Sequence, residues 1–198
     1  MSSDVSRVGK DLSIINYVIP SLVTTVENVF LTSVPSIDEI QDAVFAMDAA
    51  SAPGLDGFSS RFYKNCWDVV GSDVVLAVQD FFITGVIFLG LNSSFIILLP
   101  KLRESISVDQ FRPIVLSNFL FKISSKILAD RLARVTSRII SPQQFSFIRD
   151  RHIEDCIALA SDCVNVLQKK CYGGNLAMKI DMHKAFNTLD WSFLYKVV

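Results

Sequence analysis

The 198-residue chain is long enough for one large domain or two small ones, with enough apolar residues to build a core. Hydrophobic residues make up 51% of the sequence and charged residues 20%, which excludes an intrinsically disordered protein. Lys and Arg number 19 against 20 for Asp and Glu, so the overall charge gives no sign of nucleic-acid binding. Any such function must depend on local groups of charge.

The cysteines and the N-terminus indicate an intracellular protein. Cys66, Cys156, Cys163 and Cys171 form no CxxC pair and have no histidine at zinc-finger spacing, so free or buried thiols are expected. The N-terminal stretch "MSSDVSRVGKDLS" has no apolar core of a secretory signal. We therefore expect the nucleus or the cytoplasm.

The first half of the chain predicts helices separated by a loop. Ser36 and Glu39 have the spacing of a capping box, and apolar residues at helical period follow: Ile37, Ile40, Val44 and Met47. The prolines and glycines of "SAPGLDGF" then predict a loop. Two more helices are expected, one with Phe62, Cys66 and Val69, and another that starts near Ser72 and carries Val75, Val78 and Phe82.

The uncharged segment Phe81–Leu99 is long enough to cross a membrane. Gly85, Gly90 and the cluster that begins at Asn92 interrupt it at its centre. We therefore favour the end of a helix, a turn and a fully buried strand over Phe95–Leu99, closed by Pro100. The alternative is a small membrane-associated protein that uses this segment as its anchor.

A hairpin and a basic helix are expected next. "FRPIVLS" follows the first strand after the polar connection "KLRESISVDQ", which predicts a hairpin with Lys101 and Arg112 near its ends. From Leu120 to Ile140 the pattern is helical, with an apolar side of Leu120, Ile123, Ile127 and Leu128. Basic residues align on another face: Lys122, Lys126, Arg134 and Arg138, with Arg131 near by. Such a face is either simply solvated or a contact for nucleic acid.

The last part predicts a long helix and a strand. After "SPQQF", the stripe of Ile153, Ile157, Ala160, Val164 and Leu167 is typical of a core-facing helix, which "YGG" ends. Alternation in "NLAMKID" predicts a strand with one buried face and with Asp181 at its C-terminal end. From this pattern alone, Asp181 is either a catalytic carboxylate or a polar residue that closes a strand.

Five blocks follow one another along the chain: "SAPGLDGFSSRFYKNCWDVV", "LNSSFIILLPK", "FRPIVLSNFLFKISSKILADRL", "ISPQQFSFIRDRHIEDCI" and "MKIDMHKAFNTLDW". In this order they resemble the reverse transcriptases of LINE-type (non-LTR) retrotransposons, with plant members the most similar. The resemblance implies an α+β (α/β-like) fold, helix-rich, with the fingers hairpin and an incomplete palm sheet of a right-hand polymerase. It implies an N-terminal helical extension over residues 1–50, a fingers-like region over 51–140 and the beginning of the palm over 141–198.

The resemblance also implies roles for single residues. Asp181 corresponds to the first catalytic aspartate of the palm, which binds two divalent cations, expected to be Mg²⁺, in nucleotidyl transfer. Phe186 corresponds to the bulky residue that excludes a ribose 2′-hydroxyl, and the backbone from Met182 to Ala185 lies beside the triphosphate. Arg112 corresponds to the fingers arginine that contacts the incoming triphosphate, with Lys101 as a companion.

Nucleic-acid contacts are implied as well. Gln144 and Phe147 correspond to a Gln-x-x-Phe block near the template and the nucleotide. Contacts to the backbone of an RNA template and a DNA primer are expected from Lys122, Lys126, Arg131 and Arg134. With deoxynucleoside triphosphates, these nucleic acids are the expected partners.

Several positions depart from the family pattern. Ser51 stands where lysine is usual, Asp150 where glycine is usual, and Asn187 where aspartate is usual, while Phe145 and Ser146 alter the Gln block. These departures suggest a copy that drifts without strong selection. The Asp-Asp pair of the family's palm hairpin does not follow Trp191, so we expect a fragment truncated after the first palm aspartate motif and inactive by itself. The alternative is a non-catalytic retroelement remnant that at most binds nucleic acid.

Overall fold

The structure is a computed structural model that describes residues 20–167, 169–178, 180 and 189–197. It divides into two compact units. The central unit comprises residues 25–138, and the flanking unit comprises residues 1–24 and 139–198. The described residues form helices and one small two-stranded antiparallel sheet, which confirms a helix-rich mixed fold.

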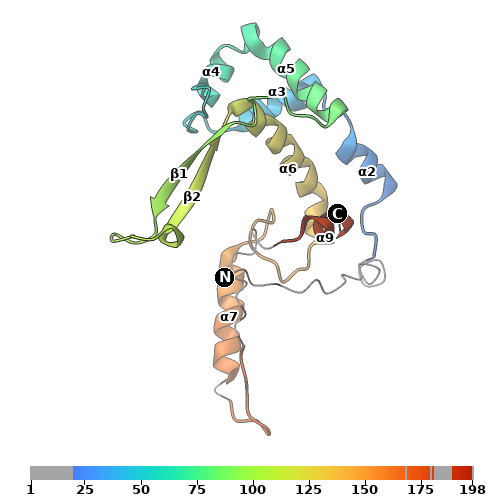
Figure 1. Cartoon of the computed structure of the whole chain (residues 1–198). Helices are drawn as coiled ribbons and strands as arrows, with labels where there is room; N and C mark the ends of the chain where they lie inside the picture. Colours follow the sequence, from blue (N-terminus) through green and yellow to red (C-terminus); the bar gives the residue numbers. More distant parts are fainter. Residues whose placement is uncertain (1–19, 168, 179, 181–188, 198) are drawn as a thin grey trace. The chain divides into compact units, whose positions relative to one another are not determined.

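The central unit holds most of the regular structure (Figure 1). In chain order its elements are α2 (Thr25–Thr32), α3 (Ile37–Ala46), α4 (Ser60–Asn65), α5 (Trp67–Thr84), β1 (Ser94–Pro100), the short 3-10 helix η1 (Val108–Gln110), β2 (Phe111–Ser117) and α6 (Phe119–Ile139), whose last residue belongs to the flanking unit.

The helix α3 begins where the sequence predicts it. Ser36 is the N-cap, and its hydroxyl accepts a hydrogen bond from the backbone N–H of Glu39 at 3.2 Å. This bond satisfies an N–H group that has no partner inside the helix, and such a cap contributes about 1 kcal/mol. Ile40 and Val44, one turn apart, are then fully buried.

The boundary between α4 and α5 lies at Cys66, and the prediction of a helix start near Ser72 was wrong. At Cys66 the φ of −105° and ψ of 16° interrupt the helical geometry between α4 and α5. Gly71 lies inside α5, where the Trp67 indole covers it so closely that a Cβ would come within 2.9 Å of the ring. The glycine therefore makes room for an aromatic ring and does not end a helix.

The core of the central unit contains side chains from α3, α5 and α6. Its fully buried apolar residues are Ile40, Val44, Val78, Phe119, Ile123 and Ile127. Tyr63 of α4 joins this core, with its ring stacked on Phe119 at a centroid distance of 4.8 Å. Burial of each such side chain contributes about 1.5–3 kcal/mol, so the stability of this unit depends on this cluster.

The strands β1 and β2 form the predicted hairpin. They are antiparallel, from Ser94 opposite Ser117 to Pro100 opposite Phe111, and extend away from the helices of the central unit (Figure 1). Side chains from Phe95 to Leu99 are between 43% and 67% exposed, so the prediction of a fully buried strand was wrong. Successive side chains alternate between the two faces, and no described element covers either face sufficiently to bury them.

Both prolines of the hairpin occupy positions that need no N–H donor. The N–H of Lys101 donates to the carbonyl of Gln110 at 2.8 Å. Hydrogen-bonded and non-hydrogen-bonded pairs alternate along the ladder, which places Pro100 and Pro113 in non-hydrogen-bonded pairs. An N–H there would point away from the partner strand, so proline removes no bond from the hairpin.

The uncharged segment Phe81–Leu99 is a helix end, a turn region and a strand, as predicted. Gly85 ends α5 with a left-handed φ of 69°, and its N–H donates to the carbonyl of Phe81 at 2.8 Å. None of the helices among the described residues combines the length and the apolar character that a membrane span requires.

The described part of the flanking unit contains α7 (Ile153–Leu167) and α9 (Trp191–Val197). The helix α7 forms where it was predicted, but the prediction that it faces a core was wrong. None of its residues is buried, and Ile153, Ile157 and Val164 are between 55% and 62% exposed. An apolar stripe is buried only where another element covers it, and no described element covers this one sufficiently.

The strand predicted over Leu176–Asp181 is not formed by residues 175–178 and 180, which have no regular structure. Leu176, Met178 and Ile180 are between 75% and 85% exposed. A strand needs a neighbour to take up its backbone hydrogen bonds, and no described residue pairs with this segment in a sheet.

Candidate functional site

Two of the predicted site residues lie near the tip of the hairpin, where residues 101–110 connect the strands. Arg112 lies opposite Leu99 in the register, and Lys101 follows directly after the end of β1, so both cations lie near the same end of the hairpin. The Lys101 ammonium donates to the carbonyl of Asp109 at 2.6 Å. No described residue accepts a hydrogen bond from the Arg112 guanidinium, which leaves its fork of donors open to an anion.

The helix α6 carries the predicted row of basic residues, but an acid interrupts it. Lys122, Lys126, Arg134 and Arg138 follow one another at intervals of four or eight residues. Asp130 occupies the gap in this row and accepts a hydrogen bond from the Lys126 ammonium at 2.7 Å. The positive charge of this face is therefore lower than the basic residues alone indicate.

The other three basic residues of this row also have partners. The Lys122 ammonium donates to the carbonyl of Ala52 at 2.7 Å. The Arg134 guanidinium lies 4.6 Å from the centre of the Phe30 ring, and Arg138 pairs with Glu27 at 2.6 Å. Partners at a solvent-exposed surface contribute only about 0–1 kcal/mol each, so a nucleic-acid phosphate can compete with them.

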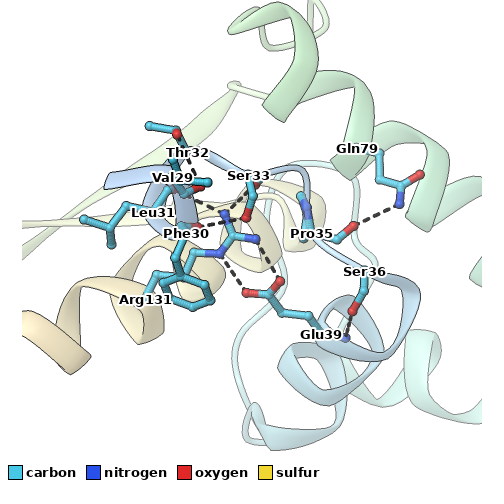
Figure 2. Close-up of polar contacts among 10 residues, drawn as sticks. All are labelled: Val29, Phe30, Leu31, Thr32, Ser33, Pro35, Ser36, Glu39, Gln79 and Arg131. Carbon is cyan, nitrogen blue, oxygen red and sulfur yellow. Dashed lines mark hydrogen bonds and ion pairs between the residues drawn. The ribbon is translucent and has the colours of Figure 1, made fainter. Parts of the chain in front are cut away.

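Arg131 points into the protein (Figure 2). Its side chain is 2% exposed, and its Nε and Nη2 donate to the two carboxylate oxygens of Glu39, each at 2.8 Å. Its Nη1 donates to the carbonyls of Leu31 at 3.2 Å and Ser33 at 2.5 Å. A phosphate cannot reach this guanidinium without breaking these contacts, so its role in this structure is to hold α6 against the segment around α3.

Aromatic rings complete the surroundings of Arg131. The guanidinium carbon lies 5.4 Å from the centre of the Phe30 ring and 5.1 Å from that of Phe82. The hydrogen bond from Arg131 holds the pKa of the Glu39 carboxyl below its usual value. Burial opposes this shift, while the charges of Arg131 and Arg134 and the backbone of Ser36 reinforce it.

The spacing of the apolar residues in α6 indicates that Arg131 is buried. Every fourth residue of α6 is buried along one row: Phe119, Ile123, Ile127, Arg131 and Val135. A cation in an otherwise apolar row at helical spacing indicates a buried charge that must be paired. The grouping of Arg131 with the surface cations overlooked this row.

Gln144 lies in an exposed loop that Arg151 holds together. Arg151 Nη1 donates to the carbonyls of Ser141 at 2.6 Å and Gln144 at 2.7 Å, and its Nη2 donates to the carbonyl of Ile140 at 3.0 Å. These carbonyls follow the end of α6, where the helix itself supplies no donors. The Gln144 carboxamide donates to the carbonyl of Ser146 at 3.0 Å.

Two residues of the same region have a left-handed backbone, Phe147 with a φ of 66° and Asp150 with a φ of 63°. Glycine adopts this conformation freely, and aspartate tolerates it better than most residues. The backbone at position 150 is therefore one that glycine would adopt without strain and that aspartate accepts.

Asp181, Met182 and Phe186 lie outside the residues that the structure describes. Within the described ranges, no group of three His, Cys, Asp or Glu side chains is arranged to hold a metal ion. The roles predicted for these three residues therefore rest on the sequence.

An apolar pocket of about 120 Å³ lies between α5 and α6. Its lining includes Ala77, Phe81, Phe88, Leu120 and Leu128, and contains no charged side chain and none of the predicted site residues. A nucleotide needs cations and hydrogen-bond donors for its phosphates, so this pocket does not suit it.

Comparison with known proteins identifies the class of this protein. Residues 100–198, half of the chain, match the family described as "Reverse transcriptase (RNA-dependent DNA polymerase)". The matched segment includes both hairpin cations, the helix α6 and the Asp181 block. The chain therefore belongs to the reverse transcriptase family.

A transposon protein is among its relatives. Over 160 residues the chain is 29% identical to a Xenopus laevis protein described as "Transposon TX1 uncharacterized 149 kDa protein". The similarity covers 80% of this chain and 12% of the length of that relative. The family match and this relative confirm the resemblance predicted from the sequence, that of a reverse transcriptase segment of the non-LTR retrotransposon type.

Proposed function

We propose that this chain forms the fingers and the beginning of the palm of an RNA-directed DNA polymerase that copies retrotransposon RNA. The observation that carries the proposal is the reverse transcriptase match over residues 100–198, which spans the Arg112 hairpin and the Asp181 block. In this proposal residues 1–50 are a helical extension, residues 51–140 are fingers-like, and residues 141–198 begin the palm.

The nucleotide contacts combine hairpin and palm residues. Arg112 binds the triphosphate through its open fork of donors, and Lys101 at the same end of the hairpin adds a second positive charge. Met182 contributes backbone beside the triphosphate, and Phe186 excludes a ribose 2′-hydroxyl. Gln144 contacts the nucleotide or the template from the loop that Arg151 holds.

Asp181 is the proposed metal ligand and catalytic carboxylate. Carboxylate oxygens are the protein ligands that Mg²⁺ prefers, so this side chain fits the ion. When bound, two such ions supply charge to the attacking and leaving oxygens of the displacement. In this proposal the remaining ligands are the Asp-Asp pair that the family resemblance implies for the palm hairpin.

Lys122, Lys126 and Arg134 are the proposed contacts to the template–primer backbone. The Lys126 and Arg134 side chains are at least partly exposed, and the internal partners of all three are weak enough to exchange for phosphate. Arg131 is not part of this surface because its guanidinium is buried against Glu39.

Primer extension tests the proposed reaction. The full-length protein that carries this chain is assayed on an RNA template with Mg²⁺ and deoxynucleotides. Asp181→Ala is expected to lower kcat by about 1,000-fold, because the charge stabilisation by bound metal is worth several kcal/mol. Asp162→Asn, on the exposed surface of α7, is the matched control and keeps full activity. Full activity of Asp181→Ala would refute the assignment.

Titration with an RNA–DNA hybrid tests the nucleic-acid surface. Lys126→Ala and Arg134→Ala are each expected to reduce the slope of log K against log salt by about one, because each removes one phosphate contact. A protein that binds the hybrid in this salt-dependent way but extends no primer is instead the non-catalytic remnant. No salt-dependent binding at all contradicts both functions.

A further inference from the structure

We propose that Asn118 is a positioning residue that sets the direction of the β1–β2 hairpin and thereby places Arg112 and Lys101; its part in nucleotide binding rests on the proposed function. The proposal follows from the "SAPGLDGF" loop, which carries no role in the polymerase site above. Asn118 lies between the end of β2 and the start of α6 and is 4% exposed.

The Asn118 carboxamide joins two segments that are distant in sequence. Its Oδ1 accepts a hydrogen bond from the backbone N–H of Asp56 at 3.2 Å. Its Nδ2 donates to the carbonyl of Gly90 at 3.1 Å, in the turn that precedes β1. One side chain thus fixes both the loop and the entrance to the hairpin. We call Asn118 together with Gly54, Asp56 and Gly90 the Asn118 latch.

Gly54 allows the loop to approach this closely. A Cβ at position 54 would lie 2.4 Å from the backbone nitrogen of Asn118 and 2.5 Å from its Oδ1, a distance that no side chain can occupy. The Lys122 ammonium binds the same loop through the carbonyl of Ala52 at 2.7 Å. The loop is therefore seated directly on the first turn of α6.

The direction of the hairpin depends on contacts at its base, because neither face of the strands is packed against another element sufficiently to hold it. The strands are largely exposed on both faces, while at the base the hydroxyls of Ser94 and Ser117 lie 3.0 Å apart. Arg112 is five residues from Ser117, about 17 Å along the strand, so a tilt of about 10° at the base moves it by about 3 Å. Displacements of about 1 Å are enough to cost about 100-fold in catalysis.

Distance measurements between spin labels test the latch without any need for activity. Labels are placed at Ile106→Cys on the hairpin tip and Val69→Cys on α5, both exposed, in the 198-residue chain with its four native cysteines changed to serine. Asn118→Ala is expected to broaden the distance distribution about twofold, from the lever length of the hairpin. Asn118→Asp, which keeps the acceptor and loses the donor, is expected to broaden it less.

The matched control is Gln79→Ala. Like Asn118→Ala, it removes a hydrogen bond from a side-chain amide to a backbone carbonyl, here that of Pro35 at 2.9 Å. This bond joins α5 to the residue before the N-cap of α3. The width of the distribution should stay unchanged in this variant even if its melting temperature falls. Should Asn118→Ala prevent folding, Gly54→Ala and Asn118→Asp carry the same test. A distribution that Asn118 variants leave as narrow as the control overturns the proposal.

Nucleotide kinetics of the full-length protein test the second part of the proposal, that Asn118 places Arg112 and Lys101 for nucleotide binding. Asn118→Ala is expected to lower kcat/KM for the deoxynucleotide by about 10- to 100-fold, while the affinity for the template–primer stays unchanged. A general loss of folding would reduce both. If the wild-type protein extends no primer, the proposed function fails while the distance measurement still decides the latch. A narrow distribution in Asn118→Ala overturns the latch whatever the activity.

Discussion

The helices α6 and α7 have similar sequence patterns but differ in how much of their apolar face is buried. Both have apolar residues at helical spacing, yet α6 buries a complete row at every fourth position, whereas α7 buries no residue. The difference lies in what surrounds them. The helices α3 and α5 contribute to the same core as α6, while no described element encloses the apolar stripe of α7.

The comparison teaches that periodicity predicts a helix and its apolar face but not whether that face is buried. Burial requires a second surface of matching shape, and the sequence of one helix contains no information on that surface. The comparison also explains Arg131. A charge is accommodated within the buried row of α6 because Glu39 and the backbone carbonyls of Leu31 and Ser33 compensate it.

Matched isoleucines test this difference most strongly. Ile127 is 1% exposed in α6 and Ile157 is 62% exposed in α7. Ile127→Ala is expected to lower the free energy of unfolding by about 4 kcal/mol, because it leaves a cavity in a packed core. Ile157→Ala should change it by less than about 0.5 kcal/mol. Urea unfolding followed by circular dichroism measures both, and equal losses would show that α7 is as well packed as α6.

Removal of the buried cation is expected to have the next largest effect. Arg131→Ala should cost the central unit about 3 kcal/mol, because it breaks a charge pair and leaves two backbone carbonyls without these donors. Trp67 fluorescence reports on this unit when the other tryptophan is replaced by Trp191→Phe. A loss as small as that of Arg134→Ala, whose side chain is exposed, would contradict the structural role of Arg131.

Acid unfolding tests the partner of Arg131. The pKa of Glu39 is lowered in the folded state, so this residue stabilises the protein above its unfolded pKa, near 4.5. That contribution is lost as the pH falls below about 4.5 and through the folded pKa. Glu39→Gln should therefore destabilise the protein at pH 7 and reduce the loss of unfolding free energy as the pH falls, which urea unfolding at a series of pH values measures. In an Arg131→Met background, Glu39→Gln should change this pH dependence much less. An equal change in both backgrounds would refute the coupling between Glu39 and Arg131.

The surface pair of α6 should give the smallest effect. Lys126→Ala removes an exposed pair with Asp130 and is expected to change the free energy of unfolding by less than about 0.5 kcal/mol. Thermal melts at low and high salt measure it. A loss above about 1 kcal/mol would mean that the basic face, like the buried row, is built for stability and not for a ligand.

Much of the central unit was predictable from the sequence. The cap at Ser36, the helix over α6 and the hairpin between Phe95 and Ser117 follow from local chemistry, and the structure confirms them. The order of the sequence blocks also predicted the family, which the match over residues 100–198 confirms. The helix break at Cys66 was missed because Phe62, Cys66 and Val69 lie at helical spacing, which predicts one continuous helix across the boundary.

The candidate site was predictable only in part. Spacing placed Arg112 and Lys101 near the end of a hairpin, and the structure confirms this position. The family resemblance grouped Arg131 with the surface cations, because its partner Glu39 is 92 residues away and no local pattern connects the two residues. The Asn118 latch was not predicted, since its contacts with Asp56 and Gly90 span 62 and 28 residues.

By itself, the sequence determined the helices α3, α6 and α7, the hairpin and the membership of the reverse transcriptase family, because these depend on local spacing and on the order of motifs. Only the tertiary structure decided which apolar faces are buried, which arginine is a structural ion pair and what holds the hairpin at its base. Burial and hydrogen bonding join residues that are far apart in the chain, and their free energies arise only when the fold brings those residues together.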